Sequence, residues 1–177
     1  QKIILNIARL RKQKDHSTLI KAFKIFSEKN KDYKLVILGH GNLHQRLSLL
    51  VDRLKIKDRV IFKGWVKDTT PYLKKSKIFV LSSVYEGLGN VLIDAINFDI
   101  PCISTDCPSG PNEILMNGRG GFLVEPKSPY LLSEKMKFCI NNYDDALIKN
   151  RFAKSKLYRF MIKQNTSKYF KYLNTFY

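Results

Sequence analysis

Short apolar runs alternate with segments of helical periodicity along most of the chain. The apolar runs are rich in Ile, Val, Leu and Phe, which is typical of strands. They occupy residues 2–7, 34–38, 59–63, 78–82, 101–105 and 121–124. Because they are continuous runs rather than alternations of apolar and polar residues, they predict a parallel sheet that is covered on both faces.

The segments between the strands repeat apolar residues at helical spacing. In segment 17–29, Leu19, Ile20, Phe23 and Phe26 fall on one helical face. Helices are predicted over residues 17–29, 43–54, 90–98 and 128–142. Alternation of strands and helices predicts an α/β fold with a doubly wound, Rossmann-like parallel sheet.

We expect one such domain over residues 1–145, followed by a basic, aromatic helical tail over residues 146–177. The 177 residues suffice for one domain with a substantial core, and the chain contains no internal repeat or Pro/Gly/Ser-rich linker. It begins with Gln rather than Met, so we expect a fragment that a further segment precedes. No apolar run approaches the length that spans a bilayer, and no secretory signal opens the chain.

Charge narrows the classes of ligand. The chain has 32 Lys and Arg against 15 Asp and Glu, a net charge of +17, which favours nucleic acids, anionic membrane surfaces or phosphate-bearing small molecules. No carboxylate follows Asp145, whereas eight cations do: Lys149, Arg151, Lys154, Lys156, Arg159, Lys163, Lys168 and Lys171. The tail therefore suggests contact with anionic lipid or with the preceding segment. A solvated helix that packs its apolar face on the domain is the alternative.

Neither cysteines nor histidines form a metal-binding pattern. Cys102, Cys107 and Cys139 include no CxxC pair, and no His stands at zinc-finger spacing. His40 and His44 are four residues apart, but a third ligand is not evident. We expect buried thiols in a reducing compartment and no metal site.

Ligands of doubly wound sheets bind outside the carboxyl ends of the strands, so the chemistry is expected in the strand-to-helix loops. These loops are residues 8–15, 39–42, 64–68, 82–90 and 105–111. The second loop, within "LGHGNLH", is not a GxGxxG sequence because His44 occupies the sixth position, and no Walker A loop occurs. A dinucleotide-binding site is therefore not supported.

The segment "EGLGNVLIDA" (86–95) suits a sugar joined to a nucleotide through phosphates. Gly87 and Gly89 allow a tight turn, and the helix start that follows offers unpaired N–H groups to an anion. Glu86 could accept hydrogen bonds from the hydroxyl groups of a sugar ring, and Asp94 could accept them from those of a ribose. The alternative is that Glu86 solvates the loop and Asp94 is an ordinary surface residue near a helix start.

Two other loops offer weaker indications. Arg9 and Lys14 follow the first strand and could neutralise a pyrophosphate, although a solvated basic loop is the alternative. Trp65, the only Trp, follows the third strand and could line a base pocket or pack in the core or a lid.

Together these segments resemble a known family. The order "NIARLRKQKD", "LVILGHGN", "VIFKGWVKD", "PYLKKSKIFVLSSVYEGLGNVLIDAINFDIPCISTDCPSGPNEIL" and "GGFLV" is similar to the carboxyl-terminal, donor-binding half of family 4 retaining glycosyltransferases. These enzymes have two Rossmann-like domains, the GT-B architecture. The resemblance covers residues 3–143 and is most specific over 78–114.

The resemblance implies roles for individual residues. Glu86 would contact donor sugar hydroxyls, Asp94 the ribose, and Arg9 and Lys14 the pyrophosphate; Glu86, Arg9 and Lys14 are the expected catalytic residues. The remaining expected donor-binding residues are Gly39, Trp65, Val66, Gly87, Leu88, Gly89, Asn90 and Val91. Two positions depart from the family pattern: Asp94 stands where Glu is usual, and Asp99 where Gly is usual.

The implied activity is transfer of a hexosyl group, with retention, from a UDP- or GDP-sugar to a glycan or lipid-linked acceptor. Cell-surface polysaccharide or lipopolysaccharide synthesis is the implied setting, in the cytoplasm, with peripheral contact to the inner face of the membrane as an option. No metal or other cofactor would be required. The acceptor would be held by an amino-terminal domain, so these 177 residues alone are expected not to transfer sugar.

Two rival functions remain. A nucleotide-sugar epimerase or hydrolase on the same scaffold would have a similar donor half. A basic nucleic-acid-binding module would explain the net charge, but it would need aromatic side chains on an exposed strand face. The aromatics here fall mostly in predicted helices and core strands, so nucleic acid is not an expected partner.

Overall fold

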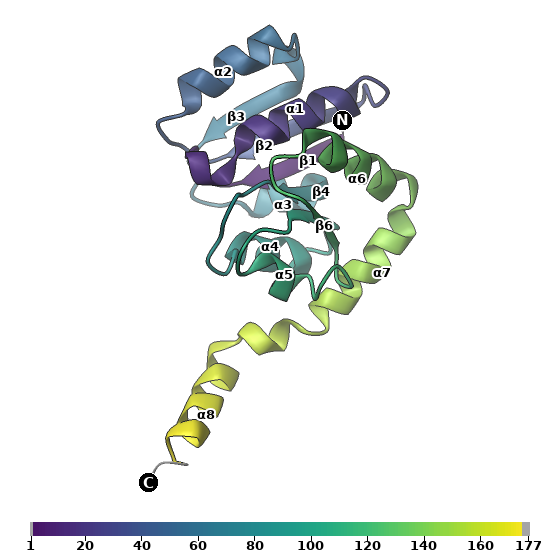
Figure 1. Ribbon diagram of the computed structural model, residues 1–177. Coiled ribbons are helices and arrows are strands. Elements are labelled where there is room, and N and C mark those ends of the chain that lie inside the picture. The colour runs from purple at the N-terminus through teal and green to yellow at the C-terminus, as the bar shows by residue number, and fades with distance from the viewer. Residues whose placement is uncertain (1, 175–177) are drawn as a thin grey trace.

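The computed structural model describes residues 2–174, in which six strands form one parallel sheet (Figure 1). The strand order is β3-β2-β1-β4-β5-β6, and every pairing is parallel. The strands are β1 Lys2–Ile7, β2 Tyr33–Leu38, β3 Val60–Gly64, β4 Ser76–Leu81, β5 Cys102–Thr105 and β6 Phe122–Val124. The predicted doubly wound α/β fold is therefore confirmed, with each strand within two residues of its expected bounds.

Helices cover both faces of the sheet, as the continuous apolar strands require. On one face α1 (His16–Ser27), α2 (His44–Arg53) and α6 (Pro129–Asn141) pack on a shared core. On the other lie α3 (Thr70–Lys75), α4 (Asn90–Asn97), α5 (Pro111–Ile114) and α7 (Tyr143–Lys154). The predicted apolar face of α1 is fully buried, and each of its two Phe side chains contributes about 2–3 kcal/mol through burial.

The direction in which successive strands are added to the sheet reverses between β1 and β4. The chain runs outward from β1 through β2 to β3, returns to β4 beside β1, and then runs outward to β6. The connections that follow β1 and β4 consequently lead to helices on opposite faces of the sheet, α1 and α4. A crevice at this switch point is where open α/β sheets place ligands.

The first part of the predicted tail packs on the domain. Asn150 of α7 is buried and donates from Nδ2 to the carbonyl of Ile100 at 2.8 Å, and Ala153 is buried against Gly120. Lys154 forms an ion pair with Asp99 at 2.8 Å, so this cation is balanced by a carboxylate of the domain and not left uncompensated.

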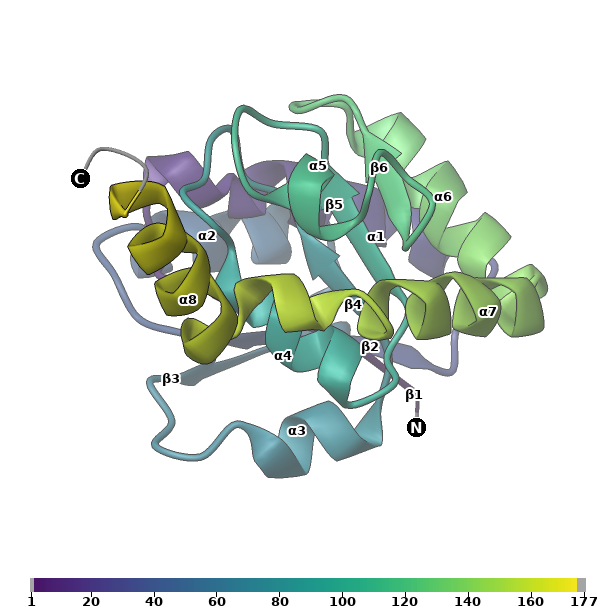
Figure 2. The same cartoon turned by 90° about the horizontal axis from the view of Figure 1, so that it is seen from below.

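A 3₁₀ helix, η3 (Leu157–Phe160), and α8 (Ile162–Leu173) follow α7. In Figure 1, α8 extends away from the sheet and its covering helices; Figure 2, the perpendicular view, shows α7 running beside α4. Ile162, Tyr169 and Phe170 are mostly exposed on α8. No helix over residues 2–174 has the length and apolar character needed to cross a membrane.

Candidate functional site

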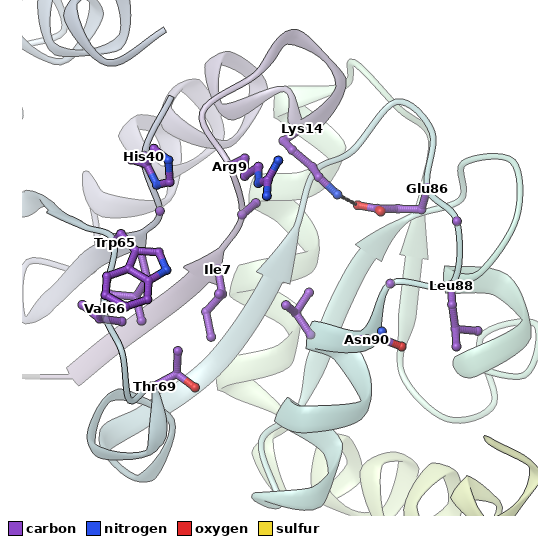
Figure 3. Close-up of a pocket in the computed structure, with 16 residues that line it drawn as sticks. Ile7, Arg9, Lys14, His40, Trp65, Val66, Thr69, Glu86, Leu88 and Asn90 are labelled. Carbon is purple, nitrogen blue, oxygen red and sulfur yellow. Dashed lines mark hydrogen bonds and ion pairs between the residues drawn. The ribbon is translucent and has the colours of Figure 1, made fainter. Parts of the chain in front are cut away.

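A cavity of about 540 Å³ opens at the switch point of the sheet (Figure 3). Its walls come from the loops that follow β1, β2, β3 and β4. The predicted site residues that line it are Arg9, Lys14, Gly39, Trp65, Val66, Glu86, Gly87, Leu88, Gly89, Asn90 and Val91. The fold therefore gathers into one place residues that the sequence distributes over more than eighty positions.

Glu86 is held at one end of the cavity by two partners. Lys14 Nζ lies 2.5 Å from Glu86 Oε1, and Ser83 Oγ donates to the same oxygen at 2.5 Å. The side chain of Glu86 is only 6% exposed, so it is fixed in a largely dehydrated position. Its second oxygen, Oε2, has no protein partner within residues 2–174 and can accept a hydrogen bond from a hydroxyl group of a ligand.

Hydrogen bonds join the loop after β1 to the loop after β4. Val84 N donates to Gln13 O at 2.8 Å, Ser82 Oγ donates to Lys14 O at 2.8 Å, and Gln13 Nε2 donates to Tyr85 O at 2.9 Å. These bonds connect segments about seventy residues apart and bring Lys14 to the carboxylate at the cavity wall.

The loop after β5 packs against the turn formed by Gly87, Leu88 and Gly89, which we call the glycine turn. Gly110 has a φ of +61°, and a Cβ at this position would lie 2.3 Å from Gly87 O and 2.4 Å from Leu88 O. Pro108 O accepts a hydrogen bond from Glu86 N at 3.3 Å. Sequence reasoning marked residues 105–111 as a loop but missed the role of Gly110, because the contact depends on a close approach between distant segments.

The glycine turn leads into the start of α4. Gly89 is the N-cap, with a left-handed φ of +78°, and no side chain caps the helix. The N–H groups of Asn90 and Val91 consequently have no acceptor among the described residues, while that of Leu92 bonds to Gly89 O at 2.9 Å. Unpaired N–H groups and the helix dipole make this end of α4 suitable for an anion.

Asp94 is the predicted site residue that does not line the cavity. It lies one turn farther along α4, and desolvation raises the pKa of its carboxyl above the usual value. Asp is one methylene shorter than Glu, which limits how far the carboxylate reaches from this turn. Contact between Asp94 and a ribose stays a prediction.

The opposite end of the cavity is apolar and open. Trp65 is 69% exposed there and, with Val66, faces Ile7 and Thr69 across the hollow (Figure 3). Of the two packing roles considered for Trp65, burial in the core is wrong. Ile7 and Thr69 were missed, because an apolar strand residue and a loop Thr carry no distinguishing pattern.

Gly39 closes the cavity between these ends. Its N–H donates to Gly64 O at 2.7 Å, its φ is +139°, and a Cβ would lie 2.0 Å from Ala8 O. No larger residue fits without moving the loop after β1. His40 follows it and also lines the cavity, a position that sequence reasoning considered only for metal binding.

The titratable side chains do not form a metal cluster in the described part of the chain. Residues 2–174 contain no group of three or more His, Cys, Asp or Glu placed to hold a metal ion. The cysteines are free and buried, and burial raises the pKa of the Cys107 thiol above its usual value and that of Cys139 to about 12. The prediction of buried thiols is confirmed.

Comparison with known proteins identifies relatives of the whole domain. Residues 1–156 match the family model described as glycosyl transferases group 1. The chain is 34% identical, over 88% of its length, to the N-acetylgalactosamine-N,N'-diacetylbacillosaminyl-diphospho-undecaprenol 4-alpha-N-acetylgalactosaminyltransferase of Campylobacter jejuni. It spans 41% of that relative.

Solved structures share the fold. A mutant of Staphylococcus aureus TarM in complex with Fondaparinux, alpha-GlcNAc-glycerol and UDP superposes with a TM-score of 0.88, at 23% identity, over 98% of this chain and 35% of TarM. Anabaena HepE in complex with UDP-glucose gives a TM-score of 0.86, at 19% identity, over 98% of this chain and 48% of HepE.

Proposed function

Because the chain belongs to the glycosyl transferases group 1 family, we propose that its cavity binds a nucleoside diphosphate sugar as the donor for glycosyl transfer. The proposed enzyme is a family 4 retaining hexosyltransferase that uses a UDP- or GDP-sugar. Its proposed acceptor is a glycan or a lipid-linked sugar in cell-surface polysaccharide or lipopolysaccharide synthesis, at the cytoplasmic face of the membrane.

The order of chemical groups along the cavity carries this proposal. Trp65 and Val66 form an apolar end for a base, Arg9 and the start of α4 offer positive potential in the middle, and Glu86 offers a carboxylate oxygen at the far end. A nucleoside diphosphate sugar has the same order: base, diphosphate, then sugar hydroxyls. Few other metabolites combine these three chemistries along one axis.

The middle of the cavity suits a diphosphate without a metal ion. Arg9 forms no ion pair in residues 2–174, so its charge is free for phosphate, whereas Lys14 already neutralises Glu86. Lys14 would contact both the carboxylate and a diphosphate oxygen. The N–H groups at the start of α4 would add two further donors.

These donors would assist departure of the diphosphate. In transfer with retention, the bond between the anomeric carbon and the phosphate oxygen breaks, and the acceptor oxygen bonds to the same face of that carbon. Arg9, Lys14 and the α4 N–H groups would stabilise the charge that develops on the leaving diphosphate. A diphosphate oxygen would take the proton of the acceptor hydroxyl, so no protein base is needed.

The acceptor is proposed to bind residues beyond these 177. The chain spans less than half of the Campylobacter jejuni relative. Holding the acceptor against the anomeric carbon can supply about 7–11 kcal/mol of the barrier. We therefore expect donor binding without transfer from this chain alone.

A panel of UDP-, GDP- and ADP-sugars tests the proposal. Thermal shift followed by calorimetry should give saturable stabilisation by one nucleotide class, in the absence of divalent cations and in the presence of a chelator. A matched protein with exposed Lys74 and Lys75 replaced by Gln should respond equally. If no member of the panel binds with or without divalent cations, the proposed donor site is wrong; binding that requires a cation would refute the metal-free arrangement.

A further inference from the structure

A groove leads from the donor cavity across the outer surface of α1 and α2. Three hollows form it, and neighbouring hollows share residues: the first shares Arg9 and His40 with the cavity, the second meets the first at Lys12, and the third meets the second at Arg46. The last two lie between α1 and α2, which run side by side on one face of the sheet (Figure 1). We call this row of adjoining hollows the α1–α2 groove.

The α1–α2 groove is lined by cations that no carboxylate neutralises. Beyond Arg9 they are Arg11, Lys12, Lys21, Arg46 and Arg53. Over residues 2–174 none of these side chains forms an ion pair, although five lysines elsewhere in that range do so outside the donor cavity. The one carboxylate in the lining, Asp15, accepts from Thr18 N at 3.2 Å and from Thr18 Oγ1 at 2.6 Å.

A buried histidine lies behind the wall of the groove and leaves its charge unchanged. His16 is 1% exposed, and neither of its ring nitrogens has a hydrogen-bond partner in the described chain. Burial lowers the pKa of His16 to about 4, so the ring is neutral at pH 7 and carries one donor and one acceptor. Both nitrogens lie beneath the surface, so the His16 ring adds neither charge nor a ligand contact to the hollow.

We propose that the α1–α2 groove binds an acidic glycan, a sugar chain bearing phosphate or carboxylate groups, as an extension of the acceptor or product beside the donor cavity. The proposal rests on the proposed glycosyl transfer. Cations on both walls match charges repeated along a chain, and the Ser17 hydroxyl matches its hydroxyl groups. Continuity through Arg9 and His40 places one end of such a chain at the donor.

Two other polyanions fit the groove less well. A bilayer surface is flat and needs protruding apolar anchors, whereas Leu49 is the sole large apolar side chain in the described groove lining that is mostly exposed. Single-stranded nucleic acid needs aromatic platforms for its bases, and no Phe, Tyr or Trp is part of the described lining of the three hollows.

Two variants with equal charge change test the proposal. The groove variant replaces Arg11, Lys12, Arg46 and Arg53 by Gln. The control variant replaces the exposed Lys29, Lys31, Lys74 and Lys75 by Gln, all outside the groove. Binding of oligogalacturonate, short-chain polyphosphate and neutral malto-oligosaccharide of similar length is measured by calorimetry at several salt concentrations, with circular dichroism to verify folding.

We expect wild type and control to bind an acidic chain, and the groove variant to bind it roughly tenfold or more weakly. Neutral chains should not bind, and UDP binding should be equal in all three proteins. Equal losses in the groove and control variants would overturn the proposal, as would groove-dependent binding of phosphatidylglycerol vesicles without binding of either acidic chain. Absence of UDP binding by wild type would contradict the proposed donor site, which is a different failure from loss of glycan binding in the groove.

Discussion

The ammonium group of Lys14 lies 2.5 Å from Glu86 Oε1, although 72 positions separate these residues in the chain. The pair is largely buried, with the Lys14 side chain 20% exposed and that of Glu86 6% exposed. A buried carboxylate that loses its cation is costly, so removal of either partner leaves the other in an unfavourable position. The donor cavity thus has a charge pair in its wall before any ligand arrives.

Breaking this pair from one side should destabilise the domain more than removing both charges. Lys14→Met is expected to lower the free energy of unfolding by about 1–3 kcal/mol, because Glu86 is left buried without its cation. The double variant Lys14→Met with Glu86→Gln should recover part of that loss. Urea denaturation of the four proteins of this cycle measures it; strictly additive losses would show that the two charges are not coupled.

Replacing Arg9 and Lys14 together by Ala should weaken binding of UDP or GDP by about 3 kcal/mol or more, since two charge-assisted contacts to the diphosphate are lost. Calorimetry at constant ionic strength measures the change. A variant with Lys74 and Lys75 replaced by Ala loses the same charge in α3, outside the cavity lining, and should bind normally. Unchanged nucleotide affinity in the Arg9 and Lys14 variant would exclude both residues from the diphosphate site.

Glu86→Gln should affect the sugar more than the nucleotide. An amide accepts hydroxyl hydrogen bonds more weakly than a carboxylate, so kcat/KM of the complete enzyme should fall by roughly tenfold to a hundredfold. Binding of bare UDP or GDP should change little. Parallel kinetics and calorimetry test this, and an equal loss in both would move Glu86 away from the sugar.

Gly110→Ala should distort the glycine turn through a steric clash. The new Cβ would lie 2.3 Å from Gly87 O, whereas a Cβ at Gly118, which also has a positive φ, meets only Gly121 O at 4.0 Å. Gly118→Ala therefore measures backbone strain alone. Gly110→Ala is expected to cost about 2 kcal/mol more in unfolding free energy and to weaken donor binding. Equal stability of the two variants would show that the glycine turn accommodates the new Cβ without a loss of unfolding free energy.

Removal of residues 161–177 should weaken binding to anionic vesicles if α8 contacts lipid. This deletion keeps α7, whose Asn150 and Ala153 are buried in the domain, and removes three Lys together with the exposed Ile162, Tyr169 and Phe170. Co-sedimentation with phosphatidylglycerol vesicles should fall by about tenfold or more. Equal sedimentation of both proteins would rule out lipid contact through this segment.

The strands and long helices could be predicted because burial leaves a local signature in the sequence. Each strand is a continuous apolar run, and the buried face of α1 repeats at helical spacing. The helices α3 and α5 were missed because they span six and four residues, less than the window in which periodicity can be recognised. Both carry Pro in the first turn, a start signal that has little meaning without a following pattern.

The candidate site was predicted in composition but not in its internal contacts. The carboxyl-edge rule and the family resemblance placed Arg9, Lys14 and Glu86 in one cavity. Neither could show that Lys14 bonds to Glu86, since pairing across 72 positions is decided by loop geometry. His16 was passed over for a related reason: it precedes the predicted helix 17–29, and its sequence gives no sign of whether its ring nitrogens find partners.

The contact between Gly120 and Ala153 fixes the base from which α8 extends. A Cβ at Gly120 would lie 2.7 Å from Ala153 Cβ, so α7 rests against bare backbone, and the hydrogen bond from Lys149 Nζ to Gly118 O at 2.8 Å fastens the same stretch. Beyond α7, η3 is fixed as well, because Leu157 is buried and Arg159 Nη2 donates to Glu113 O at 3.1 Å. The twelve residues of α8 span about 18 Å, and the helix is thus supported at its amino-terminal end by a base that includes α7 and η3.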